Sequence, residues 1–116
     1  MSLTGTAIVH IILRHISGSR ATEVDVIPLG AHQELILGRA GSAAVRFDPR
    51  RDASVGRHHA RIAPSAGDPG RFLLFDLSSR NGTFLNGERV WAGVPLHPGD
   101  LLRLGQEGPE LEFQVE

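Results

Sequence analysis

The chain has 116 residues, of which 41% are hydrophobic and 22% charged, and its net charge is -1; these values predict one globular domain and exclude a disordered chain. The absence of cysteine excludes disulfide scaffolds, cysteine nucleophiles and cysteine-based zinc sites. No apolar run approaches the length that crosses a bilayer and no secretory leader opens the chain, so we expect a cytoplasmic protein without a membrane partner.

Short apolar runs of strand length recur along the chain. In chain order they cover residues 7–13, 23–28, 34–37, 45–47, 60–63, 72–77, 83–85, 89–91, 101–104 and 111–115. Turn-forming residues separate them, at 18–19, 41–42, 67–70, 81–82, 86–87 and 98–100. This spacing predicts an all-β sandwich that forms a single domain over residues 1–116. No long window shows a helical period, so little or no helix is expected.

The pair Asn86-Gly87 gives the strongest short-range hairpin signal in the chain. It lies between the apolar runs at 83–85 and 89–91. A type I′ turn needs two consecutive residues that tolerate a positive φ angle, and Asn-Gly is a favoured pair for it. We therefore predict a tight hairpin here.

Basic residues are concentrated in one part of the chain. Residues 39–61 hold six arginines against two acidic residues, whereas residues 100–116 hold five acidic residues against one arginine. A positive face on a nearly neutral protein suits a small anionic target better than a long polyanion, so we expect no nucleic-acid partner. All 12 basic residues are arginine, whose planar side chain can bind phosphate bidentately.

Three predicted loops carry many hydrogen-bond donors and few acids: residues 38–42, 54–59 and 78–83. Such a set can surround a phosphate with charge-assisted hydrogen bonds. The loops belong to a longer pattern: LGR at 37–39, VGRHHARI at 55–62, FDLSSRNGTFLNG at 75–87, LHPGD at 96–100 and LRLG at 102–105. In this order and spacing, from about residue 35 to 105, the chain resembles the forkhead-associated (FHA) domain.

The resemblance implies an eleven-stranded, two-sheet antiparallel β-sandwich of the SMAD/FHA-like class. It also implies recognition of phosphothreonine peptides through loops at one end, with no enzymatic activity and no cofactor. The expected partner is a protein or peptide phosphorylated on threonine by a Ser/Thr kinase. That kinase, or another effector, is a possible attached or separate partner.

Several residues match the ligand-binding positions of the family. Arg39 matches the arginine that holds the phosphate, and Asn81 matches the asparagine that hydrogen-bonds the peptide backbone and helps to present the residue after the phosphothreonine. Ser79 and Arg80 lie in the same loop as Asn81, where we expect them to tune the choice of downstream residue. A surface ion pair between Arg39 and Asp48 is the simpler alternative for that arginine.

Other residues match positions that support the binding loops. Gly38 matches a packing glycine and His59 matches a histidine that braces the loops. Gly82 forms a tight turn with Asn81. His58 and His59 are adjacent on an extended segment and point to opposite faces, so we expect no metal site there. A Ser54-His59-Asp76 hydrolase lacks the nucleophile elbow that such a triad requires.

One position departs from the family pattern. The family has a serine three residues before the bracing histidine, and Gly56 stands there. Losing one hydrogen bond to a charged group costs about 1.5–3 kcal/mol, or roughly ten- to a hundredfold in affinity. The Gly56 N–H and the Arg57 guanidinium are expected to offset part of this loss, whereas Ser54 could help only after a local slip of the chain. The alternative is a phospho-independent scaffold or self-association module that uses a sheet face.

Overall fold

The computed structural model describes residues 9–30 and 33–116. These residues form eleven strands and no helix, and so no helix that could span a membrane. The strands are β1 (Val9–His15), β2 (Val24–Leu29), β3 (Leu35–Gly38), β4 (Val45–Arg46), β5 (Ala60–Ser65), β6 (Asp68–Asp76), β7 (Thr83–Leu85), β8 (Glu88–Val90), β9 (Val94–Leu96), β10 (Leu101–Leu104) and β11 (Glu110–Val115).

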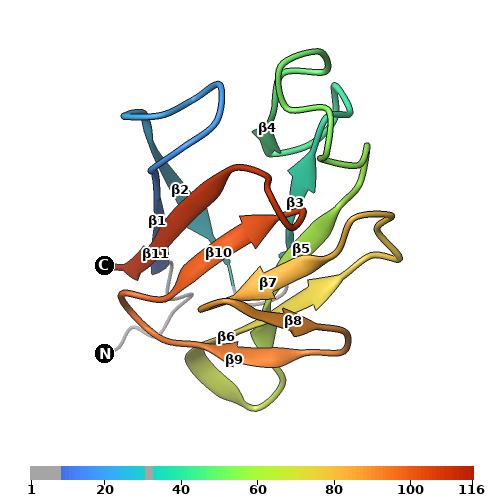
Figure 1. Cartoon of the computed structure of the whole chain (residues 1–116). Coiled ribbons are helices and arrows are strands. Elements are labelled where there is room, and N and C mark those ends of the chain that lie inside the picture. The colour runs from blue at the N-terminus through green and yellow to red at the C-terminus, as the bar shows by residue number, and fades with distance from the viewer. Residues whose placement is uncertain (1–8, 31–32) are drawn as a thin grey trace.

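The strands form two layers (Figure 1). One sheet has six strands in the order β2-β1-β11-β10-β7-β8, and the other has five in the order β4-β3-β5-β6-β9. All pairs are antiparallel except β3 and β4, which run parallel through two residue pairs. The all-β sandwich with eleven strands is therefore confirmed, with one short parallel pair added.

The core lies between the two sheets and follows the alternation of each strand. Ile11 and Leu13 of β1 and Leu111 and Phe113 of β11 point inward from the six-stranded sheet and are almost completely buried. The five-stranded sheet contributes residues from β3, β5 and β6, and the rings of Phe72 and Phe113 meet edge to face with centroids 6.3 Å apart. Each fully buried side chain of this size stabilises the fold by about 1.5–3 kcal/mol.

The sequence missed strand β9 and placed one turn differently. β9 has only three residues, with Pro95 in the middle, and lies at the edge of its sheet with β6 as its neighbour. A proline is tolerated there because one side of an edge strand forms no hydrogen bonds with a neighbouring strand, so the missing N–H is not needed. The turn predicted at 67–70 is also shorter, because Ser65 already pairs with Asp68. The pairing of β5 with β6 is irregular after Pro64, and Gly70, with a φ angle of 86°, lies inside β6 rather than in the turn.

The Asn86-Gly87 hairpin has the predicted geometry. β7 pairs with β8 from Thr83 opposite Val90 to Leu85 opposite Glu88. Asn86 and Gly87 have φ angles of 50° and 87°, as a type I′ turn requires. Two residues of the first predicted run, 7 and 8, lie outside the described part of the chain.

Replacing Gly87 by alanine is predicted to destabilise the fold by about 1–2 kcal/mol, because a Cβ atom is unfavourable in the left-handed region. The space around the new Cβ is open, so backbone conformation is the only cost. Gly41→Ala is the matched control, since Gly41 also has open space but no positive φ. Equal midpoints for the two variants in urea unfolding would contradict the assigned turn.

Candidate functional site

Three loops lie toward the same end of the sandwich: β3–β4 (residues 39–44), β4–β5 (residues 47–59) and β6–β7 (residues 77–82) (Figure 1). The first two are joined by backbone hydrogen bonds. The Arg39 N–H donates to the Gly56 carbonyl at 2.9 Å, and the Ala40 N–H donates to the Arg57 carbonyl at 3.0 Å. A Cβ atom on Gly38 would lie 2.0 Å from the Arg57 carbonyl oxygen. Glycine at position 38 is thus what permits this close approach.

His59 connects the β4–β5 loop to the β6–β7 loop. Its side chain is completely buried. The Gly56 N–H donates to Nδ1 at 2.9 Å, and Nε2 lies 2.8 Å from the Gly82 carbonyl oxygen. Since a backbone N–H is a fixed donor and a carbonyl a fixed acceptor, these partners define a neutral ring with its proton on Nε2. Burial lowers the pKa of His59, and the hydrogen bond to Gly82 and the charge of Asp76 oppose that shift only in part.

The same two hydrogen bonds decide against a hydrolytic triad. Both ring nitrogens of His59 are occupied by backbone groups rather than by Ser54 or Asp76. His58 is exposed, on the opposite side of the chain from buried His59. Within residues 9–30 and 33–116 no cluster of three potential metal-ligating side chains occurs.

Arg39 is held by carbonyl groups of the β4–β5 loop. Its Nε donates to the Val55 carbonyl and its Nη1 to the Pro49 carbonyl at 3.4 Å. A guanidinium has five N–H donors, so this anchoring leaves donors for a ligand. The alternative ion pair with Asp48 is wrong. That carboxylate instead accepts two backbone N–H groups, from Arg50 and Arg51, both at 2.8 Å.

The β6–β7 loop is organised around Asp76. Its carboxylate accepts the Ser79 hydroxyl, the Ser79 N–H at 3.1 Å and the Thr83 hydroxyl at 2.7 Å. The Ser79 oxygen in turn accepts the Gly82 N–H at 2.9 Å. The Ser79 hydroxyl therefore both donates and accepts inside the loop, which shapes the loop but limits what this hydroxyl can offer to a ligand.

Asn81 ties this loop to the β4–β5 loop, because its Nδ2 donates to the Ser54 carbonyl at 2.9 Å. Asn81 and Arg80 are both exposed. The structure thus brings Arg39, Gly56 and Asn81 into one connected group of loops.

Two of the three groups that could replace the missing serine are engaged elsewhere. The Gly56 N–H, which we expected to be available for phosphate, is bound to His59. The Ser54 hydroxyl donates to the carbonyl of Leu104, the last residue of β10, at 3.3 Å. Arg57 is exposed, and its side chain makes no ion pair with the described residues. Of the three groups considered, only the Arg57 guanidinium remains available.

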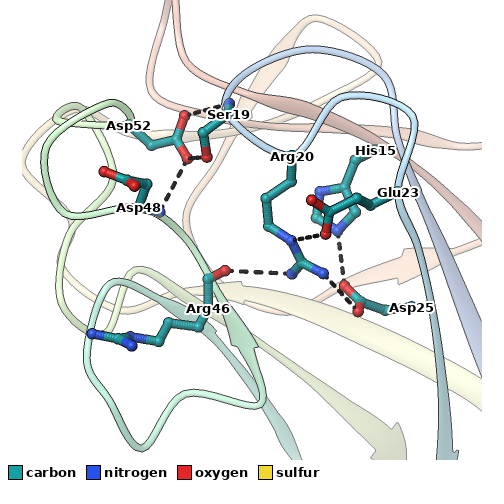
Figure 2. A network of polar contacts seen from close by, with 8 residues as sticks. All are labelled: His15, Ser19, Arg20, Glu23, Asp25, Arg46, Asp48 and Asp52. Atoms are coloured by element: carbon teal, nitrogen blue, oxygen red, sulfur yellow. Dashed lines mark hydrogen bonds and ion pairs between the residues drawn. The ribbon is translucent and has the colours of Figure 1, made fainter.

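Asp52, a buried carboxylate of the β4–β5 loop whose role the sequence did not predict, joins this loop to the other sheet. Asp52 is only 4% exposed. It accepts the Ser19 N–H at 3.0 Å, the Ser19 hydroxyl, and the Asp48 N–H at 3.2 Å (Figure 2). Ser19 belongs to the loop between β1 and β2, so the two sheets are joined directly beside the candidate site.

A second group of contacts in Figure 2 reinforces this junction. Arg20 binds Asp25 and Glu23, each at 2.8 Å, and donates to the Arg46 carbonyl at 3.3 Å. Buried His15 lies 2.8 Å from Asp25 through Nε2. Burial alone would raise the pKa of Asp25, but the hydrogen bonds from Arg20 and then His15 hold it below its ordinary value.

The arginines divide into two groups by their partners. Five form ion pairs with acidic residues: Arg14, Arg20, Arg61, Arg71 and Arg103. The other seven form none within the described residues: Arg39, Arg46, Arg50, Arg51, Arg57, Arg80 and Arg89. All seven lie in the three loops or in β4 and β8 beside them. Uncompensated positive charge is therefore gathered at one end of the molecule, which suits an anionic ligand.

Residues 35–105 match the FHA domain family. The chain is an FHA domain. Over 77 residues, or 60% of the chain, it is 36% identical to the ABC transporter ATP-binding/permease protein Rv1747 of Mycobacterium tuberculosis, and it spans 8% of the length of that relative.

Solved FHA domains share the architecture. One, studied for phosphothreonine-dependent FHA domain interactions, is 30% identical with a TM-score of 0.69, and the match covers 90% of this chain and 95% of the other. Another is Mycobacterium tuberculosis EmbR in complex with a low-affinity phosphopeptide, which is 30% identical with a TM-score of 0.68. That match covers 93% of this chain and 24% of EmbR.

The stability of this FHA domain is predicted to fall as the pH drops below about 6.5, where histidine in the unfolded chain begins to protonate. Because the pKa of His59 is lowered in the folded state, the folded ring is less protonated than the unfolded one in this range. The unfolded state then binds more protons, so the free energy of unfolding decreases with falling pH and His59 adds no slope above that range. Urea unfolding between pH 5 and 8 measures this dependence.

Two variants test whether His59 is the source of this pH dependence of stability. His59→Ala leaves the Gly56 N–H and the Gly82 carbonyl without the ring, so we expect a loss of about 2–5 kcal/mol at pH 7.5 and a weaker pH dependence. His58→Ala, an exposed neighbour, should stay within about 0.5 kcal/mol and keep the slope of the parent. An unchanged slope in His59→Ala would show that another group titrates.

Proposed function

We propose that this FHA domain recognises phosphothreonine in a partner protein and thereby serves protein–protein interaction in Ser/Thr kinase signalling. The observation that carries the proposal is the grouping of ion-pair-free arginines around loops that His59 and Asn81 hold together. A phosphothreonine carries about -1.5 to -2 charges at neutral pH, whereas threonine carries none. The location that fits this role is the cytoplasm, with the kinase or an attached effector as the further partner.

Each loop has a distinct role in this proposal. Arg39 supplies the principal charge, and its anchoring by the Val55 and Pro49 carbonyls fixes the direction of the guanidinium. Arg57 adds a second guanidinium from the β4–β5 loop. Asn81 holds the peptide backbone, while Arg80 beside it faces solvent and meets the residues that follow. The Ser79 hydroxyl acts by shaping the loop through Asp76.

Phosphate binding is weaker here than in a domain with serine at position 56. The Gly56 N–H is bound to His59 and the Ser54 hydroxyl to Leu104, so no hydroxyl of the β4–β5 loop replaces the serine. Recognition then depends on guanidinium groups, whose planar N–H pairs bind phosphate oxygens bidentately.

A phospho-independent interaction module is the second candidate, and an exposed apolar strip on the six-stranded sheet favours it. Val24 and Val26 of β2 are 52% and 57% exposed. β2 is an edge strand, and Val26 lies opposite Ile12 of β1. Edge strands with apolar faces are common sites of association. Titration with phosphorylated and unphosphorylated peptides separates the two candidates.

Arg39→Gln is predicted to reduce affinity for a phosphothreonine peptide by at least about tenfold, because one charge-assisted contact to phosphate is lost. Isothermal titration with phosphorylated and unphosphorylated forms of one peptide library measures the effect. Arg71→Gln, at the far end of β6, removes the same charge and should leave affinity unchanged. If the wild-type protein binds both forms of every peptide equally, the phosphate proposal fails and the phospho-independent module is favoured.

Gly56→Ser is predicted to tighten phosphopeptide binding by roughly ten- to a hundredfold, by adding the hydroxyl that the loop lacks. The side chain fits, because a Cβ atom at position 56 would lie 3.7 Å from His59 Nδ1, its nearest neighbour. Gly56→Ala is the matched control, since it adds the Cβ without the hydroxyl. Equal affinities for the serine and alanine variants would show that position 56 does not face the phosphate. If the Gly56→Ser variant binds phosphopeptides tightly and the wild-type protein binds none, the phospho-independent module is favoured.

A further inference from the structure

Strand β2 leaves one edge of the six-stranded sheet open to a further strand. It is the longest of the four edge strands, with six residues, whereas β4, β8 and β9 have two or three. Within residues 9–30 and 33–116 its only strand neighbour is β1. An edge strand presents unpaired N–H and C=O groups, which form a template for another strand. The β2 edge therefore has room for one.

Every second residue of β2 directs its backbone groups away from β1. The His15 N–H donates to the Glu23 carbonyl at 2.8 Å, so the Glu23 carbonyl faces β1. Since this direction alternates along an antiparallel strand, the backbone groups of Val24, Val26 and Pro28 face outward. These three residues carry the groups that a further strand could bind.

The exposed side chains along this edge are apolar. Val24, Val26 and Pro28 are exposed and alternate with residues that are half-buried or buried. Half-buried Ile12 lies opposite Val26 on β1 and extends the apolar strip across the sheet. A strand placed beside β2 would remove part of this strip from water, which is favourable.

Two residues of the edge limit how a further strand can pair. Pro28 has no N–H to donate, and Asp25 faces inward with a charge, and both features protect sheet edges in other proteins. The carboxylate of Asp25 is already bound by Arg20 and His15, each at 2.8 Å. These residues therefore restrict the register of pairing but do not close the edge.

A second antiparallel copy of β2 fits this edge in one register. With Val26 opposite Val26 of the second copy, the two valines exchange backbone hydrogen bonds, and each Val24 N–H donates to the Pro28 carbonyl of the other copy. The missing N–H of Pro28 costs only the bond to the Val24 carbonyl. Asp25 lies opposite Ile27 of the other copy, so no like charges face each other.

The neighbouring registers are less favourable. A shift in one direction places Asp25 opposite Asp25 of the second copy, and like charges directly opposite each other destabilise a sheet. A shift in the other direction places Val24 opposite Gly30, whose backbone groups are already used. The Gln33 side chain accepts the Gly30 N–H at 2.6 Å, and the Gly30 carbonyl accepts the Gln33 N–H at 3.2 Å.

We propose that a second copy of this chain binds at the β2 edge, with the two β2 strands antiparallel about a two-fold axis at Val26. Each copy uses this edge once, so the assembly closes as a dimer. The contact is smaller than the roughly 20–30 residues a side of a standard interface, so we expect a weak dimer with a Kd of roughly 10 μM to 1 mM. This inference goes beyond phosphopeptide recognition and does not depend on it.

The dimer separates the two candidate sites. The β1–β2 loop, which Ser19 ties to the β4–β5 loop, directly precedes β2, so the candidate site lies toward the start of this strand. Antiparallel copies of β2 direct their sites toward opposite ends of the joined sheet. Under the proposed function, the dimer connects two phosphorylated partners rather than two residues of one short peptide.

Sedimentation equilibrium of the full chain from about 10 μM to 1 mM tests the dimer. We expect the dimer fraction of the wild-type protein to rise with concentration. Val26→Asp places like charges opposite each other at the axis and should weaken dimerisation at least about tenfold. Trp91→Asp puts the same charge on another exposed apolar residue and should leave dimerisation unchanged. A wild-type protein that stays monomeric at every concentration would overturn the proposal.

A mixture of two variants tests the position of the axis. Val26→Asp and Val26→Arg should each be monomeric alone, because each puts like charges on the axis. Mixed in equal amounts they should form a heterodimer, since the two charges at the axis are then opposite. A wild-type dimer without recovery in the mixture would place the contact elsewhere and contradict pairing through β2.

Cysteine cross-linking tests the register, because the chain has no cysteine of its own. The Cα atoms of an opposed, hydrogen-bonded pair lie about 5.5 Å apart, within the range of a disulfide. Val26→Cys should therefore form a covalent dimer on mild oxidation. The two copies of residue 24 would lie about 13 Å apart along the strands, so Val24→Cys is the matched control. Stronger cross-linking of Val24→Cys would show that the register is wrong.

The dimer and the proposed function fail separately. Val26 lies outside the candidate loops, so Val26→Asp should keep the circular dichroism of the parent and its phosphopeptide affinity per protomer. Absence of phosphopeptide binding in a protein that dimerises through β2 would contradict the proposed function alone. Phosphopeptide binding by a wild-type protein that never dimerises would contradict only the dimer.

Discussion

The imidazole of His59 fixes the position at which the β4–β5 and β6–β7 loops meet. It is buried, accepts the Gly56 N–H and donates to the Gly82 carbonyl. Two irregular segments that are distant in sequence thus gain a common rigid support. A buried backbone group without a partner costs about 1–3 kcal/mol, so the ring also satisfies groups that the fold could not leave unpaired. The use of the Gly56 N–H for this purpose removes it from the donors that a phosphate could reach.

The loops hold much uncompensated charge because their acidic residues serve other purposes. Asp48 and Asp52 accept backbone N–H groups, and Asp76 accepts both a backbone N–H and hydroxyl groups. Each of these acids shapes a turn, and none forms an ion pair with an arginine within residues 9–30 and 33–116. Like charges on neighbouring loops repel one another, so the tethers from Ser19 and Arg20 on the opposite sheet matter for keeping the loops together (Figure 2).

Local signals in the sequence were sufficient for much of this architecture. The strands at Thr83–Leu85 and Leu101–Leu104 have the predicted bounds. The Asn86-Gly87 turn, which joins β7 to β8, has the predicted positive φ angles. In these places residue type alone limits the backbone. The family pattern likewise indicated the eleven strands and the bracing position of His59.

Features that depend on distant partners could not be predicted in this way. β9 is a strand only because β6 lies beside it. Asp25 faces inward on β2 because Arg20 and His15 form hydrogen bonds with its carboxylate. Its apolar neighbours Val24 and Val26 are instead exposed, which reverses the usual pattern. The engagement of the Gly56 N–H depends on the side-chain position of His59, which a linear pattern does not specify.

Position 56 has a consequence for how such a domain changes over time. The backbone there is already held by the buried ring, and a Cβ atom at this position would lie 3.7 Å from its nearest neighbour, His59 Nδ1. Under the proposed function, exchange of this glycine for serine would therefore alter the strength of phosphate binding without rebuilding the loops. A lineage could then reset, by one substitution, the threshold at which a phosphorylated partner is retained.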